Sequence, residues 1–252
     1  AGSRTALYYA DRINQLPLGV LGIALGTVLL PAMSSMLAVG DRAGSDHVQN
    51  RTASLSLLLT LPFAAVFVII PDTIMRGIFA HGAFDRSAAA LAAVALASYG
   101  VGLPAFALSR IVQATFYARH DTATPARVTI AALICNIALK VVFVWGLHLG
   151  IAGVALGTAF GAWINVGVLT WIGRKRELLA LDDGFYRAVL PVLMAAVAAA
   201  AGAYLGAIAL RHTSVPFREE MNLLLAMALG GGAYAVVVLM FRRSLPLGRL
   251  AG

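Results

Sequence analysis

The sequence predicts an all-α protein, a polytopic membrane bundle of about seven transmembrane helices. Long uncharged stretches follow one another along most of the chain, 60% of the residues are hydrophobic, and only 12% are charged. A helix needs about 20 mostly apolar residues to cross the hydrocarbon layer of a bilayer, and a water-soluble core does not require such runs in series.

The uncharged stretches give the order of the spans. They lie between Arg12 and Asp41, Arg51 and Asp72, Arg86 and Arg110, Arg187 and Arg211, and Glu220 and Arg242. The region 128–173 carries Lys140 as its one full charge and is long enough for two spans joined by a turn at 146–150. Membrane β-strands alternate apolar and polar residues, whereas these stretches are apolar at nearly every position, so we expect helices.

The net charge of +8 indicates membrane topology, because the basic residues are dispersed among short loops and form no patch suited to nucleic acid. One set of alternate loops carries twelve Lys and Arg residues, and the opposite set carries five. The positive-inside rule then predicts a cytoplasmic carboxyl end and, after seven crossings, an amino end outside. Residues 1–4 contain no secretory signal and resemble an opened loop, so we expect the chain to lack an N-terminal half.

A short motif occurs twice. Residues 16–27 and 147–158 are identical at eight of twelve positions, and both copies are expected to run from outside to inside. Glycines at i, i+3 and i+7 lie on one face of a helix and let a neighbouring backbone approach closely. The sequence therefore predicts helix-packing positions at Gly19, Gly22, Gly26, Gly150, Gly153 and Gly157.

Arg12 has no counterpart in the second copy, where Phe143 stands in its place. An ionisable residue at the entrance to a span is either an interfacial anchor or a group facing a water-filled cavity, and the sequence leaves both readings open. In a cavity, the planar fork of guanidinium donors suits a diphosphate, so this reading points to a phosphorylated substrate.

Several segments resemble the MurJ, or MviN, family of bacterial lipid II flippases in the multidrug/oligosaccharidyl-lipid/polysaccharide exporter superfamily. They are Tyr8–Arg12 with the glycine-rich run 16–31, then 77–84 and 116–125. The resemblance covers the whole chain and implies the second half of the family's helices. It implies that the complete protein moves lipid II, a lipid-linked disaccharide-pentapeptide, to the outer leaflet of the inner membrane by alternating access.

The resemblance also implies a division of the chain and a set of site residues. Residues 1–186 would form about five helices of one lobe, and 187–252 two C-terminal helices with a groove for the lipid tail. Arg12, with Asp11 beside it, would contact the diphosphate in the central cavity.

Some family members couple transport to sodium, and Asn136 and Thr158 are plausible equivalents of their polar groups. Lys140 departs from that pattern because a cation one turn after Asn136 opposes a sodium ion. We therefore expect coupling by the membrane potential or by protons, unless Lys140 snorkels to the interface or pairs with a carboxylate on a missing helix.

No enzyme, metal site or cofactor is expected, because the histidines lack metal-ligand spacing and no span contains paired carboxylates. Cys135, in mid-span, is expected to be a buried apolar residue. The alternatives are another exporter of the superfamily, either an O-antigen-type flippase or a multidrug antiporter, and an inactive half that acts only as an assembly partner.

Overall fold

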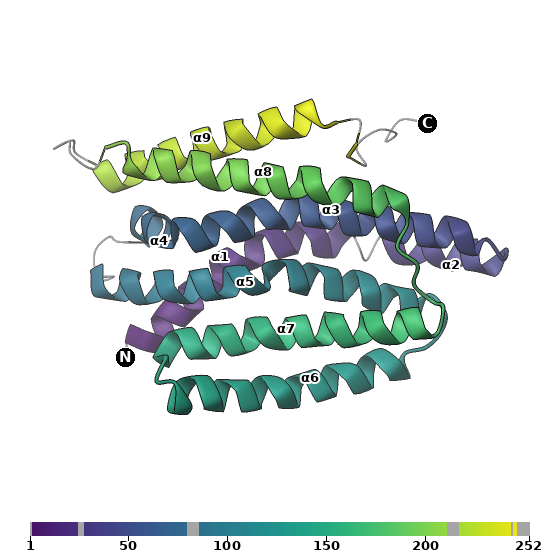
Figure 1. The fold of residues 1–252 in the computed structure, drawn as a ribbon. Coiled ribbons are helices and arrows are strands. Elements are labelled where there is room, and N and C mark those ends of the chain that lie inside the picture. The colour runs from purple at the N-terminus through teal and green to yellow at the C-terminus, as the bar shows by residue number, and fades with distance from the viewer. Residues whose placement is uncertain (1, 25–27, 80–85, 211–216, 243, 246–252) are drawn as a thin grey trace.

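The computed structural model describes residues 2–24, 28–79, 86–210, 217–242 and 244–245 (Figure 1). In this part of the chain the elements are helical, as the sequence predicted. They are α1 (Gly2–Ala24), α2 (Leu30–Ala38), α3 (Arg42–Ile69), α4 (Pro71–Phe79), α5 (Arg86–Tyr117), α6 (Ala123–Val141), the π-helical turn η2 (Val142–Gly146), α7 (Gly150–Lys175), α8 (Asp183–Ile208) and α9 (Arg218–Met240).

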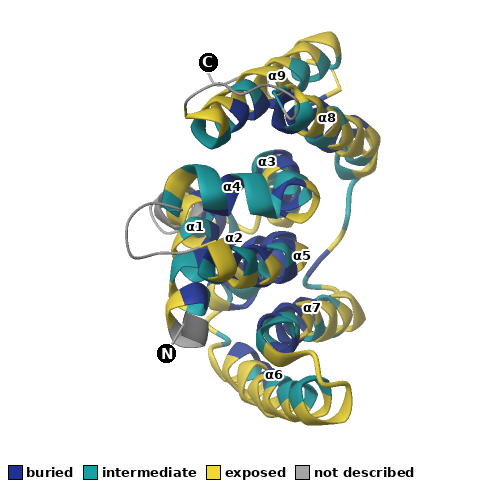
Figure 2. Ribbon diagram, turned by 90° about the vertical axis from the view of Figure 1, so that its left-hand side faces the viewer, coloured by how far each residue is buried: buried dark blue, intermediate teal, exposed yellow. Residues whose placement is uncertain are grey.

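The long helices lie side by side in the order α9, α8, α3, α5, α7 and α6, each packed on the next (Figure 1). α1 packs across α5 on one side of this row, as the view in Figure 2 shows. The short helices α2 and α4 lie at opposite ends of the bundle. We call the end that carries the α5–α6 and α7–α8 connections, with Arg119 and Arg176, the basic end.

Among the described residues, six helices are long and apolar enough to cross a membrane, namely α3, α5, α6 with η2, α7, α8 and α9. The prediction of a first span between Arg12 and Asp41 was wrong in its bounds. α1 begins ten residues before Arg12, and a separate helix, α2, starts at Leu30 with Pro31 in its first turn. Arg12 therefore lies inside α1 and not at its entrance.

Small residues line the contacts of α5, the most deeply buried span. Ala92, Ala95 and Gly102 are buried on this helix, which α1, α3 and α7 all contact. A Cβ atom at Gly102 would lie 2.7 Å from Cα of Ala159 on α7, so the two backbones are in contact. In lipid, apolar helices gain little free energy by leaving the acyl chains for one another. Van der Waals contact between closely packed helices therefore supplies much of the association energy.

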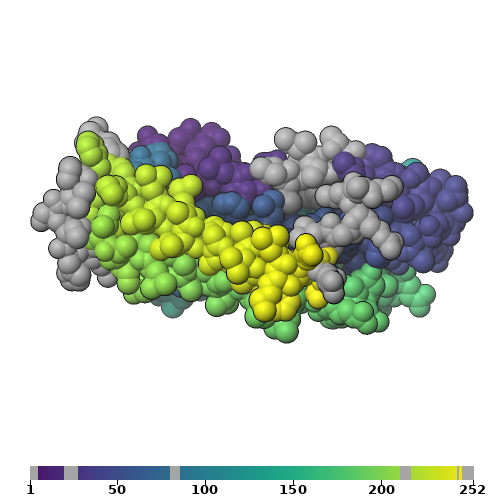
Figure 3. Space-filling view, turned by 90° about the horizontal axis from the view of Figure 1, so that it is seen from above, coloured from purple at the N-terminus to yellow at the C-terminus, as the bar shows by residue number. Residues whose placement is uncertain are grey.

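The hairpin of α8 and α9 is packed in the same way. A Cβ atom at Gly202 would lie 2.5 Å from the carbonyl oxygen of Leu229, and one at Gly230 would lie 2.9 Å from that of Ala199. Tyr234 of α9 donates a hydrogen bond of 3.2 Å to the carbonyl oxygen of Leu58 on α3. α9 lies outermost, over α8, and runs along the surface in Figure 3.

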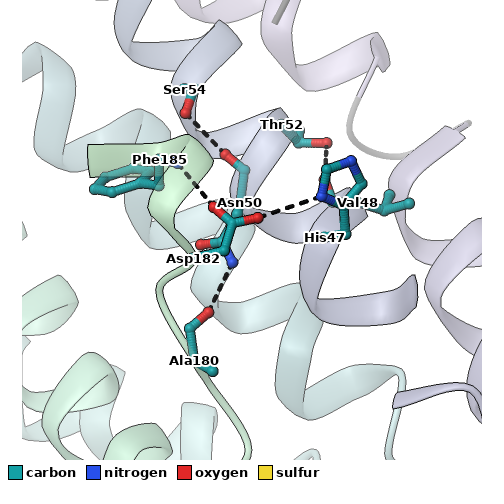
Figure 4. A network of polar contacts seen from close by, with 8 residues as sticks. All are labelled: His47, Val48, Asn50, Thr52, Ser54, Ala180, Asp182 and Phe185. Carbon is teal, nitrogen blue, oxygen red and sulfur yellow. Dashed lines mark hydrogen bonds and ion pairs between the residues drawn. The ribbon is translucent and has the colours of Figure 1, made fainter. Parts of the chain in front are cut away.

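A polar network at the basic end holds the segment that leads into α8 (Figure 4). The buried Asn50 of α3 donates to the carbonyl oxygen of Ala180 over 2.7 Å. Asp182 caps α8 by accepting from the Phe185 amide at 2.7 Å, and its other oxygen lies 3.3 Å from Nδ1 of His47. The hairpin is thus fastened to α3 at its start.

The α8–α9 contact predicts a difference between glycines of the hairpin. Gly202→Leu should destabilise the protein by about 1–3 kcal/mol, because the added side chain pushes the backbones apart. Gly232→Leu is the matched control: nothing lies within 4 Å of a Cβ at Gly232, and leucine has the higher helix propensity. Thermal melting in detergent measures both changes. Equal melting temperatures for the two variants would contradict the packing seen here.

Candidate functional site

α1 has one buried face and one polar face. Ala6, Ala10 and Asn14 recur every fourth residue and are buried. The opposite side carries Arg12, which donates a hydrogen bond of 3.2 Å to Oε1 of Gln15 and lies over the ring of Tyr8, 4.9 Å from its centroid. Gln15 in turn donates to the carboxylate of Asp11. These contacts order the guanidinium without burying it.

Arg12 lies near the middle of α1. It is ten residues from the first residue of the helix, which at ~1.5 Å per residue is about 15 Å along the axis. α1 is not one of the described helices that are long and apolar enough to cross a membrane, but contact of an exposed arginine with hydrocarbon would be costly. The polar face of α1 is therefore suited to a hydrated or protein-covered environment.

α6 and α7 pack antiparallel through a row of glycines on α7. Cβ atoms at Gly153 and Gly161 would lie 3.0 Å from Phe143 and 2.7 Å from the side-chain nitrogen of Asn136. A Cβ at Gly157 would lie 2.5 Å from Cγ of Lys140. Because these glycines lack side chains, the polar residues Asn136 and Lys140 can lie against the backbone of α7 and not point outward.

A pocket of about 490 Å³ extends from this row between α5, α6 and α7. Its lining is largely polar or small, and consists of Phe106, Ser109, Arg110, Gln113, Thr129, Ala132, Leu133, Asn136, Thr158, Gly161, Ala162 and Asn165. Asn165 donates a hydrogen bond of 3.2 Å to the hydroxyl of Thr129, which joins α7 to α6 across the pocket. The pocket thus brings Asn136 and Thr158, expected together, to one place.

Three lining oxygens are buried without a hydrogen-bond partner in the described part of the chain. They are Oδ1 of Asn136, Oδ1 of Asn165 and Oγ of Ser109. The Thr158 hydroxyl instead donates to the carbonyl oxygen of Val154 at 3.1 Å. Lys140 lies one turn beyond Asn136, is half-buried, and makes no ion pair with a described residue.

The predicted packing glycines have separate outcomes. Gly153 and Gly157 lie at the α6–α7 contact. Nothing lies within 4 Å of a Cβ at Gly19 or Gly150 among the described residues, so packing at these two stays a prediction. Gly150 instead has a φ of +53°, which suits the turn that begins α7. Gly26 lies outside the described residues, and the structure does not describe the surroundings of Gly22.

Sequence reasoning missed Gly161, Ser109 and Asn165. Gly161 continues the four-residue spacing of Gly153 and Gly157 beyond the repeated motif. This spacing could have identified Gly161 as a further packing position from the sequence. The prediction for Cys135 was wrong, because its side chain is exposed on α6. Adjacent residues of a helix point in directions about 100° apart, so Cys135 faces away when Asn136 faces α7.

Interactions at the basic end hold the start of α6 against the end of α7. Asp121 accepts the backbone amide of Thr124 at 2.9 Å, and Arg176 donates to Asp121 at 3.1 Å. Hydrogen bonds from Thr124, with the nearby Arg176 charge as a smaller cause, hold the pKa of Asp121 below its usual value. Asp121 stays ionised at neutral pH and keeps this link intact. Among the described residues no group of His, Cys, Asp and Glu could hold a metal ion.

Comparison with known proteins gives the family. The family model described as "Lipid II flippase MurJ" matches residues 1–225. The chain belongs to the MurJ family of lipid II flippases. A protein of Rhizobium tropici named "Probable lipid II flippase MurJ" is 37% identical over 205 residues, which are 76% of this chain and 38% of that protein. The "Lipid II flippase MurJ" of Burkholderia cenocepacia is 32% identical over 78% of this chain and 38% of its own length.

The fold is also that of a MurJ structure. A structure titled "Lipid II flippase MurJ, inward closed conformation" matches with a TM-score of 0.73 and 24% identity, over 96% of this chain and 48% of that one. At this identity the match shows the fold, a multi-pass membrane bundle. The chain spans about two fifths of the length of the curated relatives and about half of the solved MurJ chain.

The α6–α7 contact predicts that Gly157→Leu lowers thermal stability and accumulation in detergent. The leucine would collide with Lys140 and separate the helices, at a cost of about 1–3 kcal/mol. Gly167→Leu, on the same helix with nothing within 4 Å of its Cβ position, is the control and should melt as the parent does. Unchanged melting of the Gly157 variant would mean that this face of α7 does not pack on α6.

Proposed function

We propose that this chain is the C-terminal part of a flippase that carries lipid II from the cytoplasmic to the outer leaflet of the bacterial inner membrane by alternating access. The protein would act as a transporter and not as an enzyme, with its carboxyl end in the cytoplasm. The family assignment and the mid-helix position of Arg12 support this function. An N-terminal half would complete the cavity, in keeping with the greater length of the relatives.

Arg12 would bind the diphosphate of lipid II. Its guanidinium can donate two parallel hydrogen bonds to phosphate oxygens, which a lysine ammonium cannot do in the same geometry. The contacts to Gln15 and Tyr8 limit the rotamers of Arg12, which reduces the entropy lost on binding. Asp11 would act by positioning Gln15.

The α8–α9 hairpin would hold the polyprenyl tail. Its outer surface is apolar and exposed, with Leu190, Val197 and Leu205 on α8 and Leu224 and Met227 on α9 among the exposed side chains. Such a surface suits a long hydrocarbon chain. The connection to α3 at the basic end would keep this surface fixed relative to the lobe that carries Arg12.

Substitution of Arg12 tests the substrate assignment. Arg12→Lys keeps the charge but loses the fork of donors, so we expect poor growth in a flippase-depleted strain, with Arg12→Ala at least as damaging. Arg86→Ala is the control, because Arg86 is 80% exposed at the start of α5, and it should support growth. Normal growth with Arg12→Ala at native expression would remove Arg12 from the substrate site.

Lys140 bears on the energy source of transport. Its position beside Gly157, one turn from Asn136, puts a cation next to the polar groups that would otherwise suit a sodium ion. A unit charge ~4 Å from the ion, at an effective dielectric constant of ~20, weakens binding by about 4 kcal/mol, or roughly a thousandfold. We therefore propose coupling to the membrane potential or to protons and not to sodium.

A reconstituted flipping assay with the complete protein tests the coupling. Replacing sodium with choline at fixed pH and potential should leave lipid II movement unchanged, whereas collapsing the potential should slow it. Lys140→Met, which removes the charge and keeps the length of the chain, should reduce the response to the potential. Strong dependence on sodium in the unaltered protein would show that Lys140 points away from the ion.

A further inference from the structure

We infer that α4 positions the guanidinium of Arg12 through a row of aromatic side chains. This aromatic row consists of Phe79 on α4 and of Tyr9 and Tyr8 on α1. The inference rests on the proposed function, in which Arg12 binds the diphosphate of the substrate. It gives a role to the segment 77–84, one of those that resemble the MurJ family. The part of this segment after Phe79 lies outside the described residues.

The members of the aromatic row contact one another in order. The ring centroids of Phe79 and Tyr9 are 4.5 Å apart, and their planes are inclined by 41°. The Tyr9 ring lies 5.7 Å from that of Tyr8, nearly edge to face. Arg12 follows one helical turn later, with Cζ 4.9 Å from the Tyr8 centroid. Favourable aromatic pairs have centroid separations of about 4.5–7 Å, so contact is continuous from α4 to the guanidinium.

α4 can act as a fixed support because it is packed on its neighbours. Its residues Ile74 and Met75 are buried. A Cβ atom at Gly77 would lie 2.9 Å from Cβ of Leu223, so α4 lies directly against α9. Phe79, at the end of α4, packs on the same apolar cluster as Ile74 and Met75. The packing of α4 therefore holds the Phe79 ring in place independently of Arg12.

The burial of the rings distinguishes the aromatic row from an interfacial belt, in which aromatic side chains lie at the level of the headgroups. Tyr8 is 55% exposed, but Tyr9 and Phe79 are half-buried and pack against the apolar core. Adjacent residues of a helix point in directions about 100° apart, so Tyr9 faces the core while Tyr8 lies on the side of Arg12. The aromatic row thus runs from the core to the guanidinium.

This arrangement prepares Arg12 for a diphosphate. The electron-rich face of the Tyr8 ring attracts the guanidinium, and the remaining N–H groups stay available to phosphate oxygens. A long side chain that is already ordered loses less entropy when it binds. Removing the Phe79 ring leaves Tyr9, and through it Tyr8, without support. Affinity for the diphosphate then falls although every donor of Arg12 is still present.

Binding of lipid II by the complete protein in detergent tests the inference. Phe79→Ala should raise Kd about three- to tenfold, the effect of losing one aromatic contact, and Phe79→Leu, which keeps the apolar volume, should do the same. Phe79→Tyr keeps the ring and should bind as the parent does. Phe160→Ala is the matched control, because Phe160 pairs with Phe143 at 5.8 Å, outside the aromatic row, and it should leave Kd unchanged.

A double-mutant cycle separates positioning from a general structural role. In an Arg12→Ala background, Phe79→Ala should change Kd by less than about twofold, because no guanidinium remains to be positioned. Thermal melting shows which variants fold, and Phe79→Leu decides the result if Phe79→Ala does not.

Two outcomes would overturn the inference alone: an unchanged Kd for folded Phe79→Leu when Arg12→Ala weakens binding, or an equal loss from the Phe79 substitution in both backgrounds. An unchanged Kd for Arg12→Ala itself would overturn the proposed role of Arg12 and the inference with it. The two failures are therefore distinguishable.

Discussion

Close contact between helix backbones is the constraint on which the rest of this structure depends. Apolar helices gain little by leaving lipid for one another, so their association rests on van der Waals packing between small residues. Gly102 meets α7, Gly202 and Gly230 join α8 to α9, and Gly157 meets α6. Alanine and glycine therefore make the closest contacts in the row of long helices, while many large apolar side chains face outward.

The same constraint positions the polar groups inside the membrane. Because α7 presents glycine at 153, 157 and 161, α6 can place Asn136 and Lys140 against it and leave its apolar residues, such as Ile134 and Ile137, exposed. α1 follows the opposite arrangement, with buried alanines on one face and Arg12 exposed on the outer face, in contact with Gln15 and Tyr8. One lobe therefore carries two polar regions, a fixed cation on α1 and a polar pocket between α5, α6 and α7.

The sequence predicted the helical membrane class and the family, because apolar length and short motifs are local properties. It did not predict that α1 begins ten residues before Arg12, since the charged residues at the start of this helix lie outside the uncharged stretch. The pocket also escaped prediction, because Ser109, Thr129 and Asn165 are far apart in sequence and meet only through the register of three helices. Gly19 and Gly150 share a motif with glycines that do pack on a neighbour, yet their described surroundings differ, which no local pattern records.

The register of α6 on α7 is the central claim, and a disulfide bond tests it most directly. In Cys135→Ala protein, the pair Asn136→Cys and Gly161→Cys should link under mild oxidation, because a Cβ at Gly161 lies 2.9 Å from that of Asn136 and disulfide-bonded Cβ atoms lie ~3.8 Å apart. Native Cys135 paired with Gly161→Cys should not link, and mass spectrometry of the joined peptides distinguishes the two. A bond from Cys135 to residue 161, with none from residue 136, would contradict the account.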